Sequence, residues 1–194
     1  LQFLQPQQQD LLKARDDLRQ SIQQINRTAR QQFRETFAKI QQEFQHYFTK
    51  LFGGGQADLI LIDEDDVLES GIEIMARPPA KRPQSISLLS GGERALTAIA
   101  LLFALFKVRP SPFCILDEID APLDEANIDR FTKAFEEFLS LSQFILITHN
   151  KKTITKADCM YGVTMEQAGI SKIVSVKFTP HHSQRRTALA TAAS

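Results

Sequence analysis

The fold is decided by the stretch Leu88–Arg94, LLSGGER, which stands immediately before a long apolar run. Ser90 is a preferred N-cap residue of helices, and its spacing to Glu93 is that of a capping box. Gly91 and Gly92 carry no side chains, so the unpaired amide groups of the first turn can approach an anion closely. The stretch therefore predicts a helix N-terminus that binds a phosphate group. The alternative is an ordinary capped helix in which the two glycines have no function.

Two apolar, strand-like segments further along the chain end in polar residues. Phe113–Leu116 is followed directly by Asp117 and Glu118. The second segment, Phe144–Ile147, is followed after Thr148 by His149. Open α/β sheets place their ligand sites at the C-terminal ends of parallel strands, so we expect these side chains at one edge of a sheet. Each residue alone is more often structural or simply exposed, but their order predicts an α/β fold with a nucleotide site.

The residue types suit phosphate chemistry. A carboxylate such as Asp117 can hold Mg²⁺, which prefers oxygen ligands and bridges phosphates. Glu118 can orient or deprotonate a water molecule for attack on a γ-phosphate, and His149 can sense that phosphate. We therefore expect hydrolysis of a nucleotide rather than covalent catalysis.

This order and spacing resemble the ABC-type ATPases of the SMC family, and most closely the C-terminal head lobe of its bacterial chromosome-partition members. The likeness covers residues 85–178. The matching motifs are the signature Leu89–Glu93, the Walker B segment Phe113–Glu118, the D-loop Asp120–Asp124, the switch His149 and the segment Tyr161–Met165. One departure lies in the D-loop, where Pro122 replaces a residue that is usually small in the family. Its fixed φ affects the communication between subunits that this loop provides.

The resemblance implies the fold and the residue roles of such a head. The fold would be α/β, the C-terminal half of an ABC-type ATPase head, preceded by a long coiled-coil helix. Two heads would enclose two ATP molecules, each gripped by the Walker motifs of one head and the signature of the other. Asp117 would bind Mg²⁺, and Glu118 and His149 would act in catalysis. The residues implied in ATP binding are Ser90, Gly91, Gly92, Glu93 and Asp124.

The sequence contains no Walker A motif, which has the form G-x-x-x-x-G-K-[ST]. By resemblance, that motif lies on an N-terminal head lobe, which a folded coiled coil brings back to this one. We therefore expect ATPase activity only after the chain is completed by that lobe and by a second head. The partners implied are the N-terminal lobe, the second head of a homodimer, a kleisin subunit and DNA, and no membrane.

The function implied by the resemblance is ATP hydrolysis that drives chromosome condensation and segregation through DNA entrapment. Two other functions stay open: a related ABC-type ATPase of DNA repair, and a scaffold without hydrolysis that binds kleisin and coiled-coil partners. The intact acidic pair Asp117 and Glu118, with His149, argues against a scaffold. A transporter ATPase is disfavoured because a long polar helix stands where Walker A would precede the signature.

Residues 1–51 predict a long helix, since they hold no glycine and no proline after Pro6. From Leu11 to Leu51 apolar or small residues recur at steps of three or four, with a mean of about 3.6 residues. This spacing suits an amphipathic helix packed along one domain as well as a coiled-coil arm or neck. The resemblance favours the arm. Basic residues are interleaved with acidic ones, so a solvated face is favoured over a DNA-binding one.

Residues 52–178 are expected to form the head lobe. Gly53–Gly55 ends the first helix, and a hairpin with an acidic turn at residues 63–66 follows. A crossover helix over residues 123–139 joins the two parallel strands, and a second hairpin turns at Ala168-Gly169. The lysines at 151, 152 and 156 are either phosphate or DNA contacts or, more simply, a surface cluster. Residues 179–194 are predicted to be disordered, with His181-His182 a weak metal candidate.

Composition places few further limits on function. The 23 basic and 23 acidic residues give a net charge of zero, so any contact with DNA must be local. The apolar run from Ala95 to Phe106 is shorter than the ~20 residues of a membrane span, and no signal sequence is recognisable. We expect a cytoplasmic, chromosome-associated protein. Cys114 and Cys159 are expected to be reduced thiols.

Overall fold

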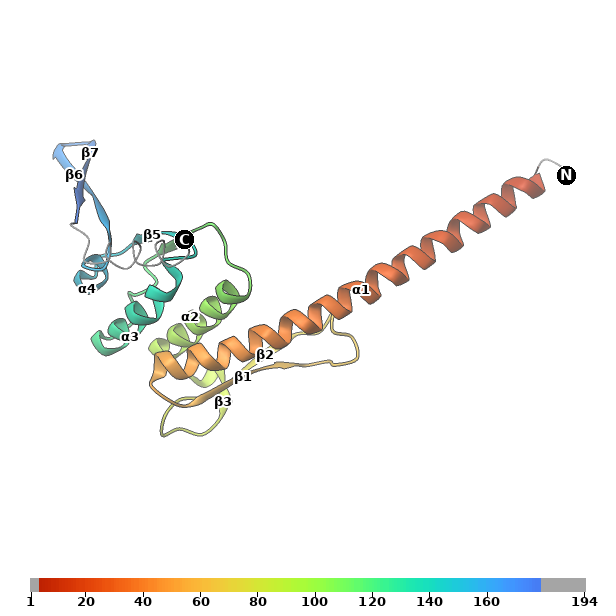
Figure 1. The fold of residues 1–194 in the computed structure, drawn as a ribbon, viewed down its shortest axis with the longest axis horizontal. Coiled ribbons are helices and arrows are strands. Elements are labelled where there is room, and N and C mark those ends of the chain that lie inside the picture. Colours follow the sequence, from red (N-terminus) through yellow and green to blue (C-terminus); the bar gives the residue numbers. More distant parts are fainter. Residues whose placement is uncertain (1–3, 179–194) are drawn as a thin grey trace, which may run out of the picture.

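The structure, a computed structural model, describes residues 4–178 of the 194-residue chain, with side chains from residue 7 onward. A long helix projects from a lobe of helices and short sheets, and a hairpin extends from the far end of that lobe (Figure 1). The helices are α1 (Leu4–Phe52), α2 (Gly91–Val108), α3 (Glu125–Phe135) and α4 (Lys151–Ile154), with 3-10 turns at Ile86–Leu88 and Glu136–Phe138. The strands are β1 (Gln56–Leu61), β2 (Ile72–Arg77), β3 (Gln84–Ser85), β4 (Phe113–Asp117), β5 (Gln143–Ile147), β6 (Cys159–Gln167) and β7 (Ile170–Lys177).

Helix α1 confirms the predicted long helix and divides it into two parts. In the first part the apolar stripe is exposed, as at Leu18 and Ile25, and the helix stands clear of the lobe (Figure 1). In the last turns Phe44, Phe48 and Leu51 are fully buried in the core. Packing along a single domain is therefore wrong for the first part of the helix, which forms a projecting arm.

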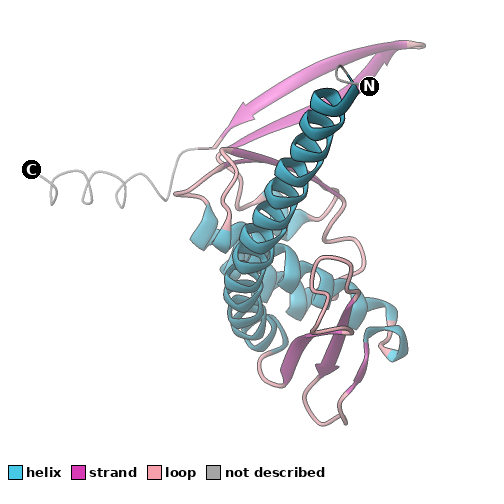
Figure 2. Cartoon of the chain, turned by 90° about the vertical axis from the view of Figure 1, so that its right-hand side faces the viewer, coloured by secondary structure: helices cyan, strands magenta, loops and turns pink. Residues whose placement is uncertain are grey.

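The glycines after α1 end the helix as predicted. Gly53, Gly54 and Gly55 all have positive φ values, which side-chain-bearing residues rarely adopt. A Cβ at Gly55 would lie 2.4 Å from the Arg77 carbonyl oxygen, so the chain can turn into β1 only with glycine there. Helix α1 and strand β1 consequently lie side by side (Figure 2).

Strands β1, β2 and β3 form an antiparallel sheet in that order, which confirms the first predicted hairpin. Residues 63–65 of the acidic turn are exposed, and α1 also holds the turn through two arginines. Arg30 of α1 binds the Asp66 carboxylate at 3.1 Å, and Arg34 donates to the Glu64 carbonyl oxygen at 3.3 Å. These two arginines therefore tie the arm to the hairpin.

An aromatic core joins α1, α2 and α3. The ring of Phe103 on α2 lies 5.7 Å from Tyr47 of α1, 5.8 Å from Phe131 of α3 and 5.0 Å from Phe138. Such aromatic pairs contribute beyond the apolar area that they bury. The core therefore fixes the root of the arm against the two helices that begin at the signature and the D-loop.

Strands β4 and β5 pair in parallel with Phe113 opposite Gln143 and Asp117 opposite Ile147, as the predicted crossover requires. The crossover helix is shorter than the predicted 123–139. It begins at Glu125, because Leu123 still donates to the Asp120 carbonyl in a turn, and it passes into a 3-10 turn at Glu136. One face of this two-stranded sheet is open, with Phe113, Ile115, Ile145 and Ile147 each more than half exposed.

The predicted second hairpin is confirmed in β6 and β7, which pair antiparallel and extend away from the lobe (Figure 2). Its apolar side chains, Tyr161, Val163 and Ile173 among them, are exposed. Over residues 4–178, no helix is both long enough and apolar enough to cross a membrane. Both cysteines are unpaired within the described part, as predicted. The predicted disordered tail and His181-His182 lie outside the described residues.

Candidate functional site

The predicted capping box is present at the start of α2. The Ser90 hydroxyl accepts from the Glu93 amide at 3.4 Å and donates to Glu93 Oε2 at 2.7 Å. The Ser90 amide also donates to Glu93 Oε2, at 3.1 Å. The carboxylate of Glu93 thus binds both the amide and the hydroxyl of Ser90 and positions that hydroxyl. Ser90 and Gly91 remain exposed.

Two basic residues hold the signature stretch from outside. The Lys81 ammonium lies 2.8 Å from Glu93 Oε1, and its hydrogen bond, with those from Ser90, holds the pKa of Glu93 below its usual value. Arg94 donates to the carbonyl oxygens of Ser87 at 3.1 Å and Leu89 at 3.3 Å. The loop before the helix is therefore fixed by Arg94, the last residue of that stretch, and by Lys81, which no short motif includes.

The two glycines of the signature differ in their surroundings. A Cβ at Gly91 would meet no atom within 4 Å, so the first-turn amides are open to a ligand on that side. A Cβ at Gly92 would lie 3.3 Å from the Pro122 carbonyl oxygen. The signature and the D-loop are consequently in close contact within this chain, at the residue where the D-loop departs from the family.

The acidic pair lies at the C-terminal end of β4 as predicted, and both side chains are exposed. Glu118 has a φ of +47°, a left-handed conformation that is uncommon for residues other than glycine. Its amide donates to the Ile147 carbonyl at 2.8 Å, and its carbonyl accepts from the Ala121 amide at 3.1 Å. Backbone strain of this kind is often retained at functional sites.

The predicted juxtaposition of the two strand ends is confirmed. Asp117 is in register with Ile147, and His149 is exposed two residues beyond it. Asp117, Glu118 and His149 therefore emerge at one edge of the parallel pair. In the described residues, His, Cys, Asp and Glu form no cluster of three that could hold a metal by itself. One carboxylate suits Mg²⁺, which usually keeps water and phosphate oxygens as its other ligands.

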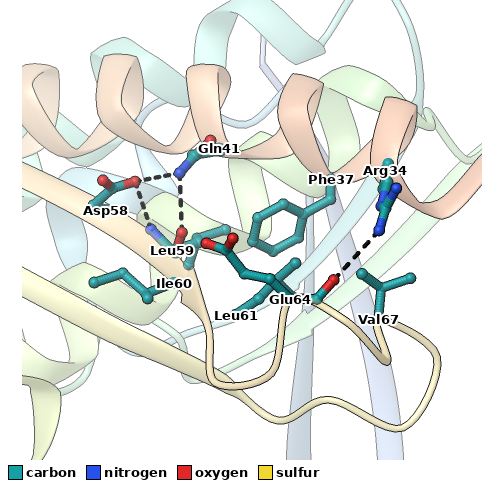
Figure 3. A pocket seen from close by; sticks show the side chains of 9 residues that line it. All are labelled: Arg34, Phe37, Gln41, Asp58, Leu59, Ile60, Leu61, Glu64 and Val67. Carbon is teal, nitrogen blue, oxygen red and sulfur yellow. Dashed lines mark hydrogen bonds between the residues drawn. The ribbon is translucent and has the colours of Figure 1, made fainter.

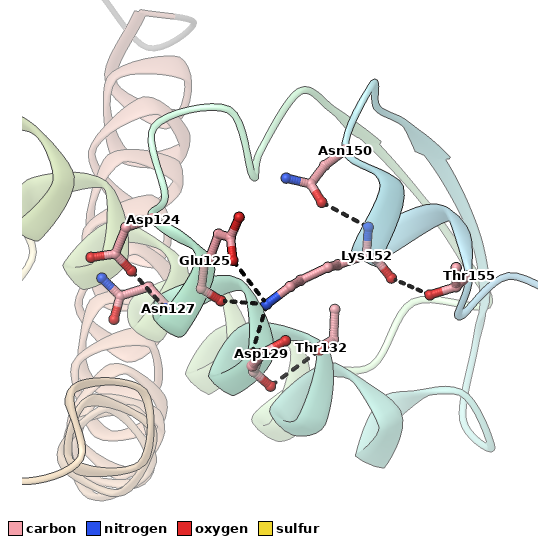
Figure 4. Close-up of polar contacts among 8 residues, drawn as sticks. All are labelled: Asp124, Glu125, Asn127, Asp129, Thr132, Asn150, Lys152 and Thr155. Carbon is pink, nitrogen blue, oxygen red and sulfur yellow. Dashed lines mark hydrogen bonds and ion pairs between the residues drawn. The ribbon is translucent and has the colours of Figure 1, made fainter.

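Asp124, predicted to bind nucleotide, is the N-cap of α3 and accepts from the Asn127 amide at 2.8 Å (Figure 4). Two of the lysines after His149, Lys152 and Lys156, form surface ion pairs. Lys152 lies 2.9 Å from Asp129 and 3.6 Å from Glu125 (Figure 4). Lys156 pairs with Glu136 at 3.0 Å. These ion pairs favour a surface cluster over contacts with phosphate or DNA.

The D-loop residue Asp120 was named in the sequence only as part of its motif, with no role of its own. Asp120 is 2% exposed, and its carboxylate accepts hydrogen bonds from Thr148 and Thr153. It thereby joins the D-loop to the segment that carries His149. Its sequence signal is the D-loop motif that it begins, and that motif does not predict burial of the carboxylate.

A cavity of about 450 Å³ lies elsewhere, between α1 and β1 (Figure 3). Phe37 lines its apolar part, while Gln41 donates to Asp58 at 2.6 Å and to the Leu59 carbonyl at 3.0 Å. No predicted site residue lines it. The candidate residues instead lie on open surface, as expected if another lobe and another head complete the site.

Comparisons with known proteins agree with this geometry. The family model of the RecF/RecN/SMC N-terminal domain matches residues 9–172. The chain is 55% identical to the chromosome partition protein Smc of Rhodopirellula baltica and 52% identical to that of Bacillus subtilis, over 90% of its own length. It spans only 15% of either relative.

Solved SMC heads have the same fold. An Smc head with an extended coiled coil from Pyrococcus furiosus, bound to the C-terminal domain of ScpA, matches 92% of this chain with a TM-score of 0.76 and 37% identity, and 44% of that chain is covered. A second structure concerns ATP-driven dimerization and DNA-stimulated activation of SMC ATPases. The match to it covers 85% of this chain and 98% of that chain, with a TM-score of 0.69 and 38% identity. The predicted α/β head fold with a coiled-coil arm is thereby confirmed, and the chain belongs to the RecF/RecN/SMC N-terminal domain family.

Proposed function

We propose that this chain is the C-terminal half of an SMC ATPase head, which dimerises around ATP and hydrolyses it to drive chromosome condensation and segregation through DNA entrapment. The observation that carries the proposal is that the chain holds only some of the groups that an ATP site needs. The capped glycine turn at Ser90 and the strand edge with Asp117, Glu118 and His149 are both exposed, in a chain without a Walker A motif.

Each exposed group has a role in this account. Ser90, Gly91 and Gly92 would present a hydroxyl and helix N-terminal amides to the γ-phosphate bound by the opposite head. Glu93 holds the Ser90 hydroxyl in place through the 2.7 Å hydrogen bond. Asp124, as the cap of α3, would contribute to the nucleotide site through the D-loop rather than by a free carboxylate.

At the C-terminal edge of the β4–β5 pair, Glu118 would orient the attacking water and accept its proton, and His149 would contact the γ-phosphate. Asp117 would hold Mg²⁺, which neutralises phosphate charge in such sites. Catalysis would then depend on positioning and charge stabilisation, with no covalent intermediate. These roles are supported by the position of the three residues at one edge of the β4–β5 pair.

The unpartnered apolar surfaces fit the missing parts of the head. Phe113, Ile115, Ile145 and Ile147 form an open sheet face that the N-terminal lobe would cover. The exposed stripe on the first part of α1 would pack against the other strand of an antiparallel coiled coil. Exposed apolar area on this scale is typical of an interface.

Partners are proposed from the related structures. One SMC head, 44% identical to this chain, is bound to the C-winged helix domain of ScpA, so we propose a kleisin as a partner here too. DNA is proposed because a related SMC ATPase is activated by DNA. A cytoplasmic, chromosome-associated location follows from these partners.

The proposal is tested by ATP-dependent head dimerisation, measured by light scattering, after the chain is assembled with its Walker A-bearing lobe. Glu118→Gln should accumulate the dimer, since turnover that separates the heads is nearly stopped. Adding Ser90→Arg should abolish that dimer by filling the phosphate position. Ser171→Arg on exposed strand β7 is the matched control and should dimerise normally. Normal ATP-driven dimerisation of the Ser90→Arg variant would exclude the proposed sandwich.

A further inference from the structure

Asp120 is a buried carboxylate that binds only hydroxyl groups in the described part of the chain. Thr148 Oγ1 donates to it at 2.8 Å, and Thr153 Oγ1 donates to the same oxygen. Among residues 4–178 it has no ion-pair partner. Burying a carboxylate without a cation costs free energy, and nearby hydroxyls offset that cost only in part. A role in stability alone does not explain a carboxylate here.

The two threonines lie on either side of the switch histidine. Thr148 immediately precedes His149, and its Oγ1 also accepts from the Asn150 amide at 2.9 Å. Thr153 is fully buried in α4, the short helix that follows. Asp120 therefore holds the His149 segment before and after the imidazole.

Along the backbone, Asp120 is also close to the turn at Glu118 that ends the Walker B segment. Asp120 follows Glu118 by two residues, and Glu118 has the left-handed φ of +47°. The Glu118 amide donates to the Ile147 carbonyl at 2.8 Å. A non-glycine residue in this region persists only when its surroundings fix it. The backbone bonds of Glu118 to Ile147 and Ala121 fix it directly, and the buried contacts of Asp120 anchor the residue two positions further along.

We propose that Asp120 is a positioning residue of the ATPase site, which locks the D-loop to the His149 segment through Thr148 and Thr153. It sets the separation between the water-orienting Glu118 and the phosphate-sensing His149. The inference rests on the proposed function. Its consequence is that the hydroxyl contacts control the rate of hydrolysis and leave nucleotide binding largely unchanged, because the Asp120 side chain is buried.

The test compares Asp120→Asn, Thr153→Val and Thr153→Ser in the completed head, with kcat and KM for ATP measured separately. Asp120→Asn and Thr153→Val should each lower kcat by at least about tenfold, since small displacements of catalytic groups are costly. KM should change by less than about twofold. Thr153→Ser restores the hydroxyl and should retain most of the rate. Thr155→Val, an exposed threonine next to the same short helix, is the matched control.

Two results would overturn this inference and leave the proposed function intact. One is an unchanged kcat for both Asp120→Asn and Thr153→Val, and the other is a fall in kcat with an equal loss of ATP-dependent dimer. The second result would assign Asp120 to folding. Failure of the proposed function is recognised separately. A wild-type head whose turnover is insensitive to Glu118→Gln would remove the catalytic role on which the inference depends.

Discussion

Glu93 is the residue whose ionisation the structure controls most clearly at the site. Hydrogen bonds from Lys81 and Ser90 favour its charged form and lower its pKa. Because the folded pKa is depressed, the unfolded chain binds more protons as the solution is acidified. The stabilisation is therefore fully present above the ordinary glutamate pKa of about 4.3 and is lost as pH falls through the lowered value.

The predicted result is a steeper acid-induced loss of stability in the wild type than in Glu93→Gln. It is measured by thermal unfolding of the completed head between about pH 6 and pH 3, a range that brackets the ordinary pKa. Glu136→Gln, which alters a surface pair with Lys156, serves as the control and should follow the wild-type curve closely. Parallel curves for wild type and Glu93→Gln would show that the Lys81 and Ser90 contacts do not hold this charge.

At the same scale, the sequence predicted the local motif but not the buried partners. The capping box needs only Ser90 and Glu93, which are three residues apart and meet within one turn. Asp120 meets Thr148 and Thr153 through the packing of a whole crossover unit, and an aspartate in a loop is normally exposed. Its burial depends on tertiary structure that no local pattern encodes.

Among the elements, α3 connects the arm to the D-loop. It begins at the Asp124 cap, and its Arg130 donates to the Phe52 carbonyl at 3.0 Å, at the C-terminal end of α1. In the 3-10 turn that follows α3, Glu137 accepts from Tyr47 at 3.1 Å and pairs with Lys50. A displacement of the arm would therefore move the helix that starts in the D-loop.

The loss of one of these contacts should loosen that connection. Arg130→Met removes a cation that binds the last carbonyls of α1, and should lower the free energy of unfolding by about 1–2 kcal/mol. Denaturant unfolding of the completed head measures the effect. Lys133→Met, on the exposed face of the same helix, should change stability by less than about 0.5 kcal/mol. Equal effects from the two variants would mean that the Arg130 contacts carry no stability.

Element types were predictable because their patterns are periodic: the α1 stripe, the two apolar strands and both hairpins all form as expected. The end of α3 was not, since the apolar spacing continues past Phe135 into a 3-10 turn. The sequence also did not decide whether the first part of α1 is exposed, because its mean apolar spacing suits a packed helix and a coiled coil equally.

At the scale of the whole molecule, the described chain leaves several large apolar surfaces uncovered, as the proposed half of an ATPase head would. Its arm stripe, its open β4–β5 face and its β6–β7 hairpin all expose large apolar side chains. The capped glycine turn proposed to bind phosphate and the acidic edge are formed in the chain, whereas a Walker A motif is absent from its sequence. We propose that the chain contributes catalytic groups to a site that it cannot complete by itself.

ATP turnover is the most direct test of that claim. It is measured for this chain alone, and again after assembly with a separate lobe that carries Walker A, each with Glu118→Gln as the control. We predict no turnover above background from the chain alone, and turnover in the assembled pair that Glu118→Gln nearly stops. Robust hydrolysis by the chain alone, or an assembled pair that is indifferent to Glu118→Gln, would contradict the account.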